Sequence, residues 1–102
     1  ESAVGILHVL GMSFVDLCRA KAAISAGVDS AQVVKDFGYG KRDFAVRNAF
    51  RDSRKLSPAF LHRALEVLAQ ADLELKSSGV DEKIVLQKTI TKIFLLLEEG
   101  KA

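Results

Sequence analysis

The chain has 102 residues, of which 49% are hydrophobic and 27% are charged, with one proline and no tryptophan. This composition excludes a disordered chain and is typical of one compact domain that forms its core without metals or disulfides. Fifteen Lys and Arg against thirteen Asp and Glu give a net charge of +2, so the surface as a whole does not attract nucleic acid or acidic lipid. A site that binds nucleic acid or acidic lipid must therefore be a local cluster of basic residues.

Two further features bear on the class of protein. The longest uninterrupted apolar run, residues 93–97, is far shorter than the roughly 20 residues of a membrane span, so we expect a water-soluble protein without a membrane partner. The single cysteine, Cys18, forms no internal disulfide, and we expect a small core residue in a reducing compartment. The chain opens on Glu1 with no leader pattern, which we interpret as a piece of a longer protein.

The first expected helix covers about residues 2–26 and stops at Gly27, a residue suited to the left-handed turn after a helix. Apolar residues at helical spacing mark one stripe on it. Val4, Val9 and Met12 lie among the residues that widen this stripe. A helix that is apolar on more than one side must be covered on more than one side, either within its own domain or by another chain.

Four more helices follow in the chain. The second, about residues 29–37, opens with a capping box in which Asp29 accepts a backbone amide and Gln32 reaches back. A turn then separates it from the third, about residues 42–55. The fourth helix spans residues 57–78, opening with Ser57 and Pro58, and the fifth spans residues 81–99, with Leu86, Ile90, Ile93 and Leu97 on its inner face. No segment alternates as a strand does, so we predict an all-α, five-helix bundle.

The chemically reactive side chains are few and form no spaced set. His8 and His62 lie on different expected helices, and neither has a metal-binding partner at helical spacing. Cys18 becomes a candidate nucleophile only if the fold brings a histidine to it. Residues 38–41, which include Tyr39, resemble the tail of a phosphate-binding loop but lack its first glycine and its final Ser or Thr. We therefore expect no catalytic residue, no cofactor, no metal and no small-molecule substrate.

Positive charge is concentrated in one segment. Residues 35–63 contain eight basic and three acidic side chains. On a helical wheel, four of the basic residues share one face, opposite an apolar face: Arg47, Arg51, Arg54 and Lys55. This face is a candidate contact for nucleic acid or an acidic partner. One alternative function is therefore a helix-turn-helix DNA-binding domain formed by residues 29–55.

Several segments, in this order, resemble the C-terminal domain of the bacterial DNA polymerase III delta subunit. They are FAVRNAF at residues 44–50, RDSRKLS at residues 51–57 and ADLELK at residues 71–76. Gly79 and the apolar residues 84–97 look like the linker and last helix of that family. Asp43 stands where the family commonly has a proline.

The resemblance implies a five-helix domain that joins equivalent domains of other clamp-loader subunits, of the gamma/tau and delta prime types, in a ring-shaped collar. It implies a bacterial cytoplasmic protein that contacts DNA weakly or only through the whole assembly, and ATPase-like modules N-terminal to Glu1. The surplus of apolar helix surface is consistent with a subunit interface, for which the candidates are Val4, Val9, Met12, Phe94, Leu95 and Leu96. The alternative is that these helices are simply central in the bundle.

Overall fold

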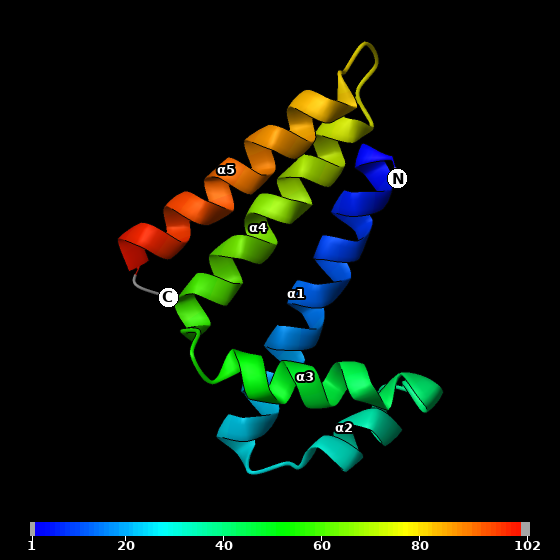
Figure 1. The fold of residues 1–102 in the computed structure, drawn as a ribbon, viewed down its shortest axis with the longest axis vertical. Coiled ribbons are helices and arrows are strands. Elements are labelled where there is room, and N and C mark those ends of the chain that lie inside the picture. Colours follow the sequence, from blue (N-terminus) through cyan, green and yellow to red (C-terminus); the bar gives the residue numbers. More distant parts are fainter. Residues whose placement is uncertain (1, 101–102) are drawn as a thin grey trace.

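The computed structural model describes residues 2–100, and the regular structure within them is entirely helical (Figure 1). The elements in chain order are α1 (Ala3–Ala26), α2 (Ser30–Asp36), a 3-10 turn (Gly40–Arg42), α3 (Asp43–Ser53), α4 (Pro58–Leu75) and α5 (Glu82–Gly100). Five α-helices without a strand in this range confirm the predicted fold class. The third and fourth helices end earlier than expected, so Arg54 and Lys55 lie just beyond α3 rather than on it.

Local capping explains where the helices begin and end. Ser2, Asp29 and Ser57 each accept a hydrogen bond from a backbone amide three residues ahead, at 2.9 to 3.0 Å. Gly27 ends α1 in the left-handed conformation, as predicted. The capping box was wrong in one detail, because the Gln32 side chain donates forward to Asp36 at 2.7 Å instead of reaching back.

The helices form two packed groups that share α1. Helices α4 and α5 run antiparallel, with the first half of α1 beside them, while α2 and α3 pack at the other end of α1 (Figure 1). The molecule is elongated, with extents of 45 × 32 × 19 Å. The long helix α1 therefore connects two regions that have separate interiors.

Each region has its own core. The larger core is formed by α1, α4 and α5, and its buried residues are Leu7, Phe60, Leu61, Ala64, Leu68, Ala71, Val85 and Ile93. The smaller core is formed by α1, α2, the following turn and α3, and its buried residues are Ala23, Val33, Tyr39 and Val46. Apolar burial is the main driving force for such packing, so the larger core provides more of the stability.

The inner face of α5 matches the predicted one at Leu86, Ile93 and Leu97, which pack in the larger core, and differs from it at residues 89 and 90. Ile90 was expected inside and is exposed, whereas Thr89 is buried and donates its hydroxyl to the Val85 carbonyl at 2.7 Å. Leu96 packs against the larger core. Because Thr is polar, a hydropathy pattern does not assign it to a core, yet the bond to its own helix makes its burial inexpensive.

By length and composition, α1 also qualifies as a helix that can cross a membrane. Uninterrupted apolar runs do not reveal this, because polar and charged residues such as Asp16 and Arg19 interrupt the apolar sequence. Its buried residues Leu7, Ala20 and Ala23 face the bundle. Only 11% of its most apolar stretch is buried, so much of α1 has no cover within the described residues.

Candidate functional site

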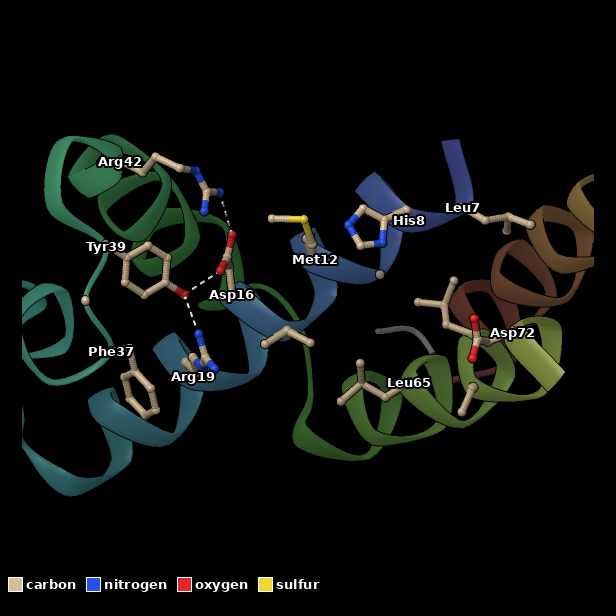
Figure 2. A pocket seen from close by; sticks show the side chains of 15 residues that line it. Leu7, His8, Met12, Asp16, Arg19, Phe37, Tyr39, Arg42, Leu65 and Asp72 are labelled. Carbon is tan, nitrogen blue, oxygen red and sulfur yellow. Dashed lines mark hydrogen bonds and ion pairs between the residues drawn. The ribbon is translucent and has the colours of Figure 1, made fainter. Parts of the chain in front are cut away.

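A groove of about 630 Å³ runs along α1, between α4 on one side and the turn after α2 on the other (Figure 2). Met12 and Val15 of α1 and Leu65 of α4 give it an apolar lining. Polar residues lie at its two ends: His8 and Asp72 at one, and a cluster around Tyr39 at the other. We call this feature the groove.

Tyr39 organises the polar end of the groove. Its hydroxyl donates a hydrogen bond to the Asp16 carboxylate and accepts one from the Arg19 guanidinium at 3.1 Å (Figure 2). The Arg19 guanidinium also lies over the Phe37 ring, 4.1 Å from its centroid. Arg42 reaches the other oxygen of Asp16 at 3.8 Å. This network joins α1 to the segment that connects α2 and α3.

Burial and the bond to Asp16 shift the titration of this phenol. Burial, followed by the hydrogen bond to the Asp16 carboxylate, raises the pKa of Tyr39 above its ordinary value. The hydroxyl is therefore a neutral donor at physiological pH. Its role in this geometry is to hold Asp16 in place rather than to act as a base.

Two glycines place Tyr39 in the smaller core. Gly38 and Gly40 on either side of it have φ values of 66° and 57°, in the left-handed region that other residues avoid. The chain reverses direction there, so the Tyr39 ring points back onto α1 while its hydroxyl meets Asp16. The segment that resembles the tail of a phosphate-binding loop thus serves as a turn.

The predicted basic face lies on the surface of α3 and just after it. Arg47, Arg51, Arg54 and Lys55 are all exposed, while Val46 and other residues of the opposite face pack inward. Arg47 pairs with Asp43, and Arg51 pairs with Asp52 at 2.9 Å. The bond from Arg51 lowers the pKa of the Asp52 carboxyl, so that carboxylate stays charged beside the arginines. Aspartates on the same helix thus partly neutralise the face.

The six candidate interface residues fall into separate surface areas. Val4, Val9, Met12, Phe94 and Leu95 are exposed, Val9 and Phe94 both to 60%, whereas Leu96 is half-buried. Met12 lines the groove, and Val9 lies on another side of α1 beside Ile6. The structure thus presents apolar surface on α1 and on α5, and assigns Leu96 mainly to internal packing.

The structure brings two of the three reactive side chains to one surface depression and leaves the third apart. Cys18 and His62 line the same open depression of about 240 Å³, but His8 lies in the groove. Burial raises the pKa of the Cys18 thiol, which disfavours the reactive thiolate. Within residues 2–100, no group of three His, Cys, Asp or Glu residues is arranged to hold a metal ion.

Comparison with known protein families identifies the family to which the chain belongs. Residues 1–93 match the model of the DNA polymerase III delta subunit, C-terminal domain. The chain belongs to this family. The resemblance found in the sequence is thereby confirmed. A search of curated proteins and a search of solved structures each found no match.

As the C-terminal domain of a delta subunit, the chain is a component of a clamp loader and assembles with other subunits. Sequence patterns alone did not indicate the residues that shape its groove, namely Asp16, Arg19, Phe37 and Arg42. The nearest signal in the sequence was Tyr39, an aromatic residue between two glycines. Its partners lie about 20 residues away on α1, a distance that helical periodicity does not bridge.

Proposed function

We propose that this domain is the oligomerisation, or collar, module of the delta subunit, which holds together the clamp loader that places the sliding clamp on primed DNA. Its partners in this role are subunits of the gamma/tau and delta prime types, in a bacterial cytoplasm. Its work is non-covalent, and any contact with DNA is weak or made through the whole assembly. Membership of the delta-subunit family supports this role.

The observation that carries the proposal is the exposed apolar surface of the two longest helices. Val4, Val9 and Met12 on α1, and Phe94 and Leu95 on α5, are all at least 40% exposed. Phe94 and Leu95 are adjacent in the chain, and contiguous exposed apolar surface is typical of protein interfaces because leaving it in water is unfavourable. A subunit within a ring uses two different faces for its two neighbours, and α1 and α5 offer two such faces.

Charge substitutions on α5 test the proposal. The full-length delta subunit with Phe94→Asp and Leu95→Asp is mixed at micromolar concentration with purified gamma/tau and delta prime subunits, and the complex is measured by size-exclusion chromatography. We expect the double variant to lose most of the complex, because each buried carboxylate would lack a partner. Leu73→Asp is a matched control, since Leu73 is 61% exposed on α4 and outside the predicted interface.

The outcomes are distinct. Complex formation by the wild type and by Leu73→Asp, with loss in the double variant, supports the collar role. A wild-type subunit that ignores its partners, or a double variant that assembles normally, contradicts it. Circular dichroism of each variant verifies that the helices remain folded.

The alternative function, a helix-turn-helix DNA-binding domain at residues 29–55, draws support from the exposure of Arg47, Arg51, Arg54 and Lys55. The pairing of Arg47 and Arg51 with aspartates reduces the charge available to phosphates. Titration against duplex DNA at several salt concentrations separates the two functions. A DNA-binding domain gives an affinity that falls steeply with salt, whereas a collar domain gives weak binding or none.

A further inference from the structure

The groove differs from the other apolar surfaces because it is concave and has a charged end. Met12, Val15 and Leu65 form its apolar lining. Gly11 of α1 also lines it, and a Cβ atom added there would meet nothing within 4 Å. An incoming helix can therefore approach the backbone of α1 closely at this point.

The charged end of the groove carries two arginines, Arg19 and Arg42, of which Arg42 is exposed and Arg19 is half-buried. The Arg19 guanidinium is bonded to the Tyr39 hydroxyl and stacked on Phe37. The Arg42 side chain is 49% exposed, and its closest carboxylate among residues 2–100 is Asp16, at 3.8 Å. That separation is too long for a hydrogen bond, so the guanidinium of Arg42 keeps N–H donors free to bind a carboxylate.

The acidic side chains at the groove are already engaged. The Asp16 side chain is only 14% exposed and accepts a hydrogen bond from Tyr39. At the opposite end, Asp72 pairs with Lys76 at 3.0 Å. The groove therefore combines an apolar lining with a positive end whose charge is not fully balanced, and this complements a ligand that is apolar along its length and acidic at one end.

We propose that the groove binds an amphipathic helix of another clamp-loader subunit, with apolar side chains on Met12, Val15 and Leu65 and a carboxylate on Arg42. This partner assignment rests on the proposed collar function. A helix fits better than a nucleic acid, because apolar side chains rather than basic ones line most of the groove. The Tyr39 network is then a positioning element, which holds Asp16 and so fixes where Arg42 points.

Removing the charge of Arg42 is the first test. Arg42→Gln in the full-length subunit is expected to weaken binding to the assembled partner subunits about tenfold, because a charge-assisted bond to the incoming carboxylate is lost. Lys83→Gln is the control: it removes one positive charge from an exposed residue that lies outside both the groove and the basic face. Equal affinities for the two variants overturn the proposal.

A photoreactive amino acid at Met12, with Arg42 intact, gives an independent test that does not depend on the fold of the Arg42 variant. In the assembled loader we expect crosslinks to a helix of a gamma/tau or delta prime subunit that carries an Asp or Glu beside its apolar face. Crosslinks only to a second copy of this chain, only to DNA, or to no partner overturn the groove proposal.

The two tests also separate this proposal from the collar role. The wild-type subunit can assemble while Arg42→Gln leaves the affinity unchanged and the Met12 probe forms no crosslink to a partner subunit. In that case the collar role stands and the groove proposal fails. If the wild-type subunit does not assemble, both fail.

Discussion

The two ends of this domain are held together by different kinds of interaction. At one end, α4, α5 and the first half of α1 enclose eight buried apolar residues. At the other, α2 and α3 share a core of four with α1, one of them Tyr39, and polar contacts complete the packing. Lys21 also donates to the Ser53 carbonyl near the end of α3, at 3.1 Å. Apolar burial thus stabilises one end, while the other depends on specific hydrogen bonds and is more sensitive to single polar changes.

The largest effect is expected in the larger core. Leu61 is 2% exposed, and Leu61→Ala removes buried apolar volume that the close-packed helices cannot refill. We expect a loss of about 3 kcal/mol in the free energy of unfolding, measured by urea denaturation. A loss below about 1 kcal/mol would contradict the assignment of Leu61 to the main core.

The smaller region should respond most to loss of a single hydroxyl. Tyr39→Phe keeps the ring but removes the donor to Asp16 and the acceptor for Arg19. We expect a loss of about 2 kcal/mol, because a mostly buried carboxylate loses a hydrogen bond. Hydrogen exchange should accelerate in α2 and α3 and change little in α4 and α5. Uniform acceleration along the chain would show that the two regions do not differ as described.

The stability of the domain at alkaline pH gives a second test of the part that Tyr39 plays in the smaller region. Because the pKa of Tyr39 is raised in the folded state, the unfolded chain loses its phenolic proton first as the pH rises. Stability is therefore full below the ordinary tyrosine pKa and falls as the pH rises from about 10 toward the folded-state value. Tyr39→Phe should remove this part of the decline in stability. The midpoint of urea denaturation, measured at a series of pH values, tests this. An unchanged decline in the variant would assign it to other groups, such as Cys18.

Two glycine substitutions should have opposite signs. Gly38 has a φ of 66°, so Gly38→Ala places a side chain in the left-handed region and should cost about 1 kcal/mol. Gly11 lies within α1 with open space around it, so Gly11→Ala should stabilise the domain by about 0.5–1 kcal/mol. Thermal denaturation of both variants measures the difference. A destabilising Gly11→Ala would contradict the open geometry of the groove at that point.

The smallest effect is expected at the surface pair between α4 and α5. Arg63 donates to Glu99 at 3.0 Å, and both side chains are more than half exposed. Arg63→Ala should lower stability by no more than about 0.5 kcal/mol, since solvent screens such pairs. A double-mutant cycle with Glu99→Ala isolates the coupling, and a value above about 1 kcal/mol would show that ion pairs contribute strongly at this end as well.

Much of the fold could be predicted from local sequence. The caps at Asp29 and Ser57 and the glycine at residue 27 act within a few residues of their own helices, so the chain itself reveals them. The inner face of α5 was harder to predict. The burial of Thr89 and the exposure of Ile90 depend on how α5 rotates against α4, which is a tertiary property.

The candidate site was less predictable for the same physical reason. Met12 was found from its excess apolar character, but its place in a groove depends on Leu65, more than 50 residues away. Arg42 was one of many basic residues in its segment until the fold placed it beside Asp16. Patterns within one helix indicate which face is apolar, but they do not indicate which other helix meets it.

Hydroxyl-radical footprinting of the assembled loader tests most directly whether sister subunits cover the apolar faces of this domain. The oxidation of Met12, Phe94 and Leu95 is measured in the free full-length subunit and in its complex with gamma/tau and delta prime subunits. We predict strong protection of these three side chains on assembly, with Leu73 labelled equally in both states. Equal labelling of Met12, Phe94 and Leu95 in the free and assembled states would contradict the account.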